Sequence, residues 1–192
     1  MLSPSLLIAA YRAGYFPMAM DDGEIRWYSP DPRGVLPLDR FHAPRRLLRV
    51  VRSRRFEISV DRAFREVMEG CAADREEGTW INGEILDSYC ALHGHGLAHS
   101  VEVWAGGELA GGLYGVSLNG AFFGESMFHR VSDASKVALW ALVERLRDRR
   151  FALLDIQWLT PLLASCGAVE MPRDQYLEAL AEALQRDTRF QA

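Results

Sequence analysis

The stretch at residues 121–158, AFFGESMFHRVSDASKVALWALVERLRDRRFALLDIQW, decides the fold. It begins with an apolar run, continues with apolar residues at helical spacing, and ends in a second apolar run. We expect a strand at residues 121–128, a long helix at 132–150 and a strand at 151–159. A strand, a helix and a strand in this order predict a crossover between parallel strands.

The residues before this stretch predict an antiparallel meander. Apolar runs at residues 99–104 and 109–118 are followed by Asn119-Gly120, and an Asn-Gly pair between two apolar runs is a strong hairpin signal. A meander joined to a crossover implies an α+β chain with a mixed sheet and helices on both faces. This order resembles that of the acetyltransferase (GNAT) fold.

Further elements are expected on either side. Residues 15–39 are rich in proline and glycine, which argues against long regular elements there. We expect a small N-terminal domain at residues 1–32 and a catalytic domain at 33–192. The remaining predicted elements are strands at 56–60 and 168–171 and helices at 3–14, 43–54, 61–72 (with Asp61 as N-cap), 82–96, 160–167 and 173–186.

Composition fits a globular protein of 192 residues with a net charge of −4. No apolar run approaches the roughly 18 residues of a membrane span. The N-terminus has no basic region typical of a signal peptide. The three cysteines are odd in number and widely spaced, as expected for reduced thiols. Together these features predict a cytoplasmic protein.

Charge is unevenly distributed along the chain. Residues 33–55 contain eight arginines and a single acid, Asp39, so this segment carries +7 and the rest of the chain −11. A dense basic segment on an acidic body suggests a polyanionic partner, whereas the alternative is a solvated, arginine-rich helix.

The segment LLDIQW (153–158) places Asp155 and Gln157 on the same face of an otherwise apolar strand. Burying this pair without partners would cost several kcal/mol, so the two side chains either find partners in the core or face a site. Glu125 on the preceding strand would lie across the strand gap. Ligands bind at such gaps in open sheets, and three converging polar groups favour a site.

Other chemistries have weaker support. His93, His95 and His99 have metal-ligand spacing, but no cysteine or acid completes a set, so no metal is expected. No GxSxG elbow is present, and the cysteines have no recognisable catalytic partner. The glycine-rich turn that would hold a coenzyme A pyrophosphate is missing after residue 125.

Eight short motifs follow one another along the chain: YRAGYFPM, WYSPDPRGVLPLD, DREEGTWI, AHSVEVW, GGLYGV, FFGESMF, ASKVAL and LLDIQW. Together and in this order they resemble the leucyl/phenylalanyl-tRNA–protein transferase family. The similarity runs from about Tyr11 to Tyr176 without obvious gaps.

The resemblance implies an aminoacyltransferase. Such an enzyme moves leucine or phenylalanine, and less well methionine, from aminoacyl-tRNA to the N-terminal arginine or lysine of a protein, which marks that protein for degradation by the N-end rule pathway. A small N-terminal part would pack on an acetyltransferase-like domain. The resemblance implies no metal and no coenzyme, and we expect a monomer.

The resemblance also assigns residues. Asp155 would polarise or orient Gln157, and this catalytic pair would receive or relay the proton of the attacking amine. Glu125 would bind the cationic acceptor residue. The aminoacyl pocket would be lined by Leu113, Phe122, Leu139, Leu142, Leu146 and Leu154. Periodicity alone would assign the three helical leucines to the core.

The tRNA would be bound by aromatic and basic side chains. Trp80 and Tyr89 match aromatics around the terminal adenosine, and Arg45 and Arg49 match a basic cluster that contacts the acceptor stem. Met18 stands beside the adenosine where the family often has tryptophan, which is a departure from the pattern. Two alternatives remain open at this stage: a coenzyme A-dependent N-acyltransferase and a non-catalytic RNA-binding protein.

Overall fold

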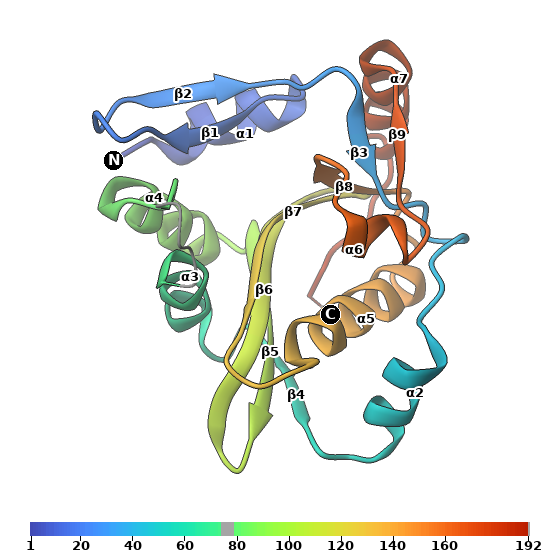
Figure 1. The fold of residues 1–192 in the computed structure, drawn as a ribbon. Helices are drawn as coiled ribbons and strands as arrows, with labels where there is room; N and C mark the ends of the chain where they lie inside the picture. Colours follow the sequence, from blue (N-terminus) through green and yellow to red (C-terminus); the bar gives the residue numbers. More distant parts are fainter. Residues whose placement is uncertain (74–78, 192) are drawn as a thin grey trace.

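A computed structural model describes residues 1–73 and 79–191 of the chain. Residues 74–78, the first part of the DREEGTWI motif, lie outside the described residues. Most of the described strands form a single seven-stranded sheet, with helices packed on both of its faces (Figure 1).

The seven-stranded sheet is mixed. Its spatial order is β4 (Glu57–Val60), β5 (Ala98–Ala105), β6 (Glu108–Leu118), β7 (Ala121–His129), β8 (Leu153–Gln157), β3 (Arg33–Val35) and β9 (Val169–Met171). Within this sheet β7 and β8 pair in parallel, and the other neighbours are antiparallel. The predicted meander is therefore β5–β6–β7, and the predicted crossover joins β7 to β8.

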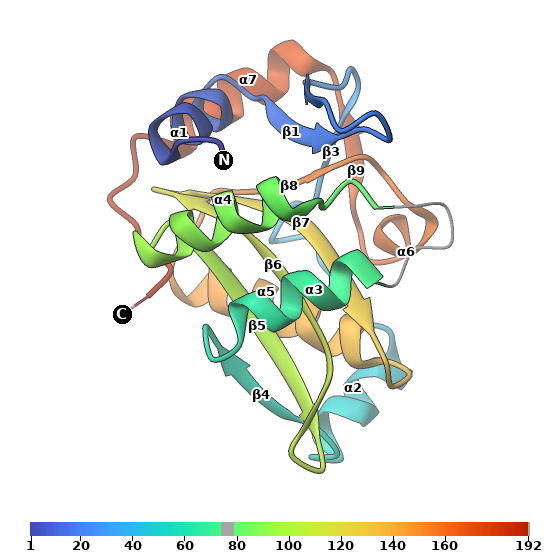
Figure 2. The same cartoon turned by 90° about the vertical axis from the view of Figure 1, so that its left-hand side faces the viewer.

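The described helices divide between the two faces. The crossover helix α5 (Ala134–Asp148) covers one face together with α2 (Arg45–Arg52) and α6 (Pro161–Ala164). The opposite face carries α3 (Phe64–Ala73) and α4 (Gly83–Gly94), as Figure 2 shows, with α1 (Pro4–Arg12) and α7 (Arg173–Ala183) nearer its β8 side. Each face encloses its own apolar cluster, which confirms the predicted mixed sheet with helices on both faces.

The N-terminal residues contribute more regular structure than their composition predicts. β1 (Phe16–Ala19) and β2 (Ile25–Tyr28) form a separate antiparallel hairpin. The three residues of β3 then enter the main sheet between β8 and β9. These strands are too short to produce a detectable alternation of apolar and polar residues.

The Asp61 cap is a further correction. Helix α3 begins at Phe64, and Asp61 has a positive φ of 59° instead of capping it. One Asp61 carboxylate oxygen accepts the Ser100 backbone N–H at 2.9 Å, and the other lies 2.8 Å from Nδ1 of His99. The side chain therefore ties the end of β4 to β5.

In the part of the chain that is described, no helix is both long and apolar enough to traverse a bilayer.

Candidate active site

The sheet opens where β7 and β8 stop pairing. The two strands are in register only from Ala121 opposite Leu153 to Phe123 opposite Asp155, and both continue beyond that point. A β-bulge shifts the register between β6 and β7 at Tyr114/Gly115, which adds local twist just where the strands separate. The sequence predicted a ligand gap between these strands, and a cavity of about 460 Å³ lies there.

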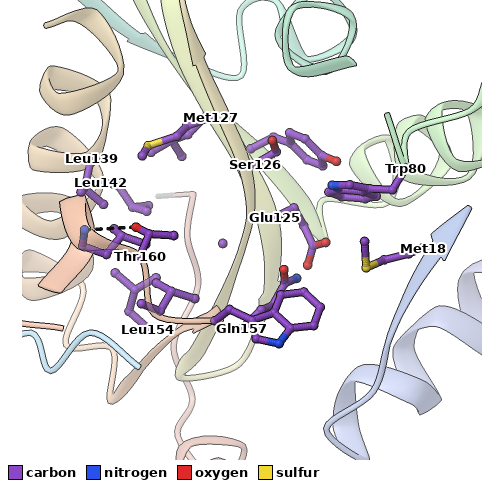
Figure 3. A pocket seen from close by; sticks show the side chains of 16 residues that line it. Met18, Trp80, Glu125, Ser126, Met127, Leu139, Leu142, Leu154, Gln157 and Thr160 are labelled. Atoms are coloured by element: carbon purple, nitrogen blue, oxygen red, sulfur yellow. Dashed lines mark hydrogen bonds between the residues drawn. The ribbon is translucent and has the colours of Figure 1, made fainter. Parts of the chain in front are cut away.

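The cavity connects the two faces of the sheet, because side chains from both apolar clusters line it. Figure 3 shows leucines of α5 at one side and residues of the β1 and α4 regions at the other. We call three parts of the wall the aliphatic end (Leu113, Met127, Leu139, Leu142, Leu154, Ile156, Leu163), the polar centre (Glu125, Gln157) and the aromatic end (Met18, Trp80, Trp158). Tyr114, Gly124, Ser126 and Thr160 complete the lining.

Glu125 is a buried carboxyl group that faces the cavity. The Tyr11 hydroxyl donates to its Oε1 at 2.7 Å, and the Tyr89 hydroxyl lies 3.5 Å from its Oε2. Burial raises the pKa of Glu125 to about 7, although the Tyr11 hydrogen bond and the nearby Gln157 amide favour the ionised form. Glu125 can therefore change its protonation state near neutral pH.

Gln157 lies opposite Glu125 in the polar centre and occupies a strained turn. Its φ is +65°, a backbone conformation that residues other than glycine rarely adopt. The Trp158 N–H donates to the Ile156 carbonyl at 2.7 Å and so closes a tight turn around Gln157. Gln157 is only 7% exposed, and its Nε2 makes no well-formed hydrogen bond to any described residue. Strain combined with a buried donor that makes no well-formed hydrogen bond is typical of a functional position.

Asp155 lies beneath this turn and does not line the cavity. Its Oδ1 accepts from the Gln157 backbone N–H at 2.8 Å and from Arg33 Nε at 2.9 Å. Its Oδ2 accepts from Arg33 Nη2 at 2.6 Å and from the Tyr176 hydroxyl at 2.7 Å. Each Asp155 oxygen thus accepts two hydrogen bonds within the protein, which leaves no lone pair to contact a substrate.

Arg33 is the buried cation that holds Asp155 in place. It is 1% exposed, and its Nη1 donates to the Gly14 carbonyl at 3.0 Å. The guanidinium also lies 4.9 Å from the Phe16 ring centre and 4.5 Å from that of Tyr176. Burial would lower the pKa of Arg33, but the hydrogen bonds and charge of Asp155 outweigh it and raise the pKa above its ordinary value. Arg33 thus joins the N-terminal segment to the strained turn.

The expected aminoacyl pocket is matched in part. Leu113, Leu139, Leu142 and Leu154 line the aliphatic end. Phe122 and Leu146 are not among the residues that line the cavity: both are fully buried, and the Phe122 ring packs 5.1 Å from that of Phe190. These two side chains belong to the core behind the wall.

Only some of the residues expected at the terminal adenosine line the cavity. Met18 and Trp80 line the cavity, whereas Tyr89 does not. Tyr89 is fully buried, packs edge-on against Tyr114, and its hydroxyl contacts Tyr11 and Glu125. A side chain enclosed in this way has no free ring face for a base, so its place is behind Glu125.

Arg45 and Arg49 are exposed on α2, on the α5 side of the sheet and away from the cavity lining. Arg33, which belongs to the same arginine-rich segment (residues 33–55), is buried instead. The basic segment of the sequence is therefore divided in the structure: four of its eight arginines lie on α2, one, Arg33, is an internal cation, and Arg40, Arg54 and Arg55 lie outside α2.

Some residues around the cavity were not identified from the sequence. Met127 and Trp158 each lie close in sequence to a predicted polar residue, so the neighbours of Glu125 and Gln157 could have been included. Tyr11 and Tyr176 are remote in sequence from the groups they contact, and no local pattern marks them. Among the described residues, His, Cys, Asp and Glu side chains do not gather in groups of three or more that could hold a metal ion.

Solved structures with a related arrangement are distant. The structure of L-PGS from Bacillus licheniformis is 13% identical and covers 85% of this chain and 55% of that one, with a TM-score of 0.44. A GCN5-related N-acetyltransferase from Kribbella flavida is 9% identical, with a TM-score of 0.39 and coverage of 88% and 61%. The fold class rests on the strand order and helix placement of the chain itself.

Comparison with known sequences identifies the family. Residues 35–181 match the model of the leucyl/phenylalanyl-tRNA protein transferase family, and residues 1–31 match that of the N-terminal domain of the same transferase. Proteins named leucyl/phenylalanyl-tRNA–protein transferase from Herpetosiphon aurantiacus and Gloeobacter violaceus are each 55% identical over 190 residues. The alignments cover 98% of this chain in both cases, and 98% and 97% of the respective relatives. The chain therefore belongs to the leucyl/phenylalanyl-tRNA–protein transferase family of aminoacyltransferases.

Proposed function

We propose that this enzyme transfers leucine or phenylalanine, and less well methionine, from aminoacyl-tRNA to the N-terminal arginine or lysine of acceptor proteins, marking them for degradation by the N-end rule pathway. One observation carries the proposal: a single cavity crosses the sheet with an aliphatic end, a polar centre and an aromatic end. This order matches the chemistry of an aminoacyl-adenosine, in which an ester lies between an apolar side chain and a nucleoside.

The aliphatic end supports binding of the amino acid side chain. Its leucines come from β6, α5, β8 and α6 and present no charged group. Complete burial of a leucine or phenylalanine side chain provides about 1.5–3 kcal/mol. A charged side chain would lose its hydration there without finding a partner.

The polar centre supports the acyl transfer. The acceptor α-amine attacks the ester carbonyl, a C–N bond forms, the ester C–O bond breaks, and the tRNA hydroxyl leaves with a proton. Glu125 would bind the cationic acceptor, take the proton that the amine loses and pass it to the leaving tRNA oxygen, since its pKa of about 7 suits that exchange. Gln157 Nε2, which is buried near Glu125 and makes no well-formed hydrogen bond, would donate to the carbonyl oxygen as negative charge develops.

Asp155 would act as a positioning residue. The hydrogen bond from the Gln157 N–H to Asp155 orients the strained turn, consistent with the expected orienting role. We do not assign proton transfer to Asp155, because its oxygens already accept from Arg33, Tyr176 and the Gln157 backbone.

The tRNA would contact two parts of the molecule. Its terminal nucleoside would enter the aromatic end beside Met18 and Trp80, and phosphates of the acceptor stem would meet Arg45 and Arg49 on α2.

The aminoacyl ester is already activated, so the reaction requires no coenzyme or metal. We further propose that the enzyme is a monomer, acts in the cytoplasm where aminoacyl-tRNA is made, and has a domain boundary near residue 32.

Incubation with radiolabelled Leu-tRNA and two otherwise identical peptides, one beginning with arginine and one with acetylated arginine, tests this function. Label should move only to the peptide with the free α-amine, and a peptide beginning with glutamate should accept poorly. Transfer from acetyl-coenzyme A alone, or retention of tRNA without any transfer, would contradict the proposal and support one of the two alternatives.

A further inference from the structure

Trp158 is an exposed aromatic side chain at the aromatic end of the cavity. It is 44% exposed although it follows the strained Gln157 directly. The other large apolar side chains that are exposed in the described chain do not line the cavity; they are Met1, Leu6, Tyr15, Ile58 and Leu177. An indole left partly in water at the edge of a ligand cavity has a large apolar face available for a flat ligand.

The Trp158 ring is held in place from behind. It packs edge-on against Phe16 at 5.2 Å between ring centres and contacts Tyr28 at 6.3 Å. Phe16 is itself buried and lies against the Arg33 guanidinium. A ring that is already fixed loses little conformational freedom when a ligand packs on it, so the binding free energy is reduced little by ordering.

The backbone of Trp158 is fixed as well. Its N–H closes the turn on Ile156, and the backbone of β3 passes very close to it at Gly34. A Cβ atom at Gly34 would lie 2.8 Å from the Trp158 carbonyl carbon, so only glycine permits this approach. The Asp155 and Arg33 contacts hold the preceding residue. The position of the indole is therefore coupled to that of Gln157.

We propose that Trp158 is the surface on which the base of the 3′-terminal nucleoside of the tRNA stacks. This inference rests on the proposed function, because the aminoacyl ester must reach Gln157 and Glu125 with the nucleoside on the aromatic side. Stacking by the residue directly after Gln157 sets the distance between the base and the polar centre. Trp80, also in the aromatic end, contributes to the same compartment.

The test compares binding of two uncharged tRNAs, identical except that one lacks the 3′-terminal adenosine. Stacking of one base on an aromatic ring corresponds to a change of about 5- to 150-fold in affinity. Trp158→Ala and Trp158→Leu should raise the Kd for the full-length tRNA by a factor in this range and leave the Kd for the shortened tRNA unchanged. Trp158→Phe should retain most of the affinity, since it keeps an aromatic face.

Tyr15→Ala is the matched control. Tyr15 is an aromatic residue of nearly equal exposure, 45%, that does not line the cavity, so its removal should leave both Kd values unchanged. If Trp158→Ala does not fold, the comparison of Trp158→Leu with Trp158→Phe decides, because both are apolar and only one has a ring.

Two results would overturn the stacking role: unchanged affinity of the leucine and alanine variants for full-length tRNA, or an equal loss for both tRNAs. If the unaltered protein still transfers leucine in either case, only the stacking role fails. If the unaltered protein neither transfers leucine nor distinguishes the two tRNAs, the proposed function itself is wrong, and the stacking role falls with it.

Discussion

At the residue level, Glu125 should control the pH dependence of transfer. Because burial raises its pKa to about 7, the carboxylate form that accepts a proton becomes populated as pH rises through about 7. The single-turnover rate with Leu-tRNA should rise in this range. The Glu125→Gln variant should transfer slowly, and its rate should rise only where the acceptor α-amine loses its proton, at about pH 8. An unchanged profile in Glu125→Gln would exclude Glu125 as the proton acceptor.

The same residue should make folding stability depend on pH. A carboxyl group whose pKa rises on folding favours the folded state at low pH, and this contribution is lost as pH increases through the folded-state value. The change from 4.5 to about 7 corresponds to roughly 3 kcal/mol. Chemical denaturation measures the free energy of unfolding between pH 4.5 and about 7. In Glu125→Gln this free energy should no longer depend on pH through residue 125, whereas Glu182→Gln, at an exposed position on α7, should retain the dependence.

Gln157 allows strain and chemistry to be separated. Glycine tolerates its φ of +65°, and alanine does not, so Gln157→Gly should be more stable than Gln157→Ala by about 1 kcal/mol. Both variants lack the amide and should lose most transfer activity. Urea unfolding and transfer assays on the two proteins check this. Full activity in Gln157→Gly would show that the turn, and not the amide, is what the reaction requires.

At the level of elements, the Arg33–Asp155 pair joins β3 to β8. Both side chains are almost completely buried, so removal of either leaves a charge without its partner and should cost about 3–5 kcal/mol. The loss in the double variant should be much smaller than the sum of the single losses. A double-mutant cycle in urea measures this coupling. The exposed Arg65–Asp87 pair, with a contact of 2.9 Å, is the control and should show little coupling.

A second readout tests whether this pair also positions the catalytic turn. Arg33→Lys keeps the charge but cannot form the two parallel hydrogen bonds to Asp155. We expect lower turnover with little change in tRNA affinity. Equal effects on turnover and tRNA affinity would instead indicate a purely structural role.

The sequence predicts the elements from β4 onward well and the short strands before β4 poorly. The strand and helix order from β4 to α7 follows from apolar periodicity and turn signals, because each element is long enough to show its period or is bounded by clear caps. β3 has three residues and is stabilised by neighbours more than 100 positions away, so no local signal reveals it.

The candidate site shows the same division. Asp155, Gln157 and Glu125 stand out locally as polar residues within apolar strands. The sequence does not show that these residues have different environments. Asp155 contacts Arg33 and Tyr176, whereas Gln157 and Glu125 face the cavity. Which polar residue is enclosed and which is accessible depends on long-range packing, and a window of sequence does not contain this information.

At the level of the whole molecule, α2 concentrates exposed positive charge on a protein with a net charge of −4. Arg45→Ala combined with Arg49→Ala should weaken tRNA binding and flatten its salt dependence by about one unit of the log–log slope for each lost phosphate contact. Filter binding over a range of salt concentrations measures both effects. Arg12→Ala with Arg189→Ala removes equal charge from exposed sites outside α2, and equal effects in the two pairs would show that only net charge matters.

The insertion of β3 between β8 and β9 has a consequence for biosynthesis. Residues 33–35 leave the ribosome early, yet both of their sheet neighbours lie beyond residue 152. During translation β3 has no strand to pair with until nearly the entire polypeptide has been made, and Arg33 has no Asp155 to bind. The polypeptide therefore acquires its catalytic architecture only at the end of synthesis, and a nascent chain stalled before residue 152 should be sensitive to proteases around residue 33.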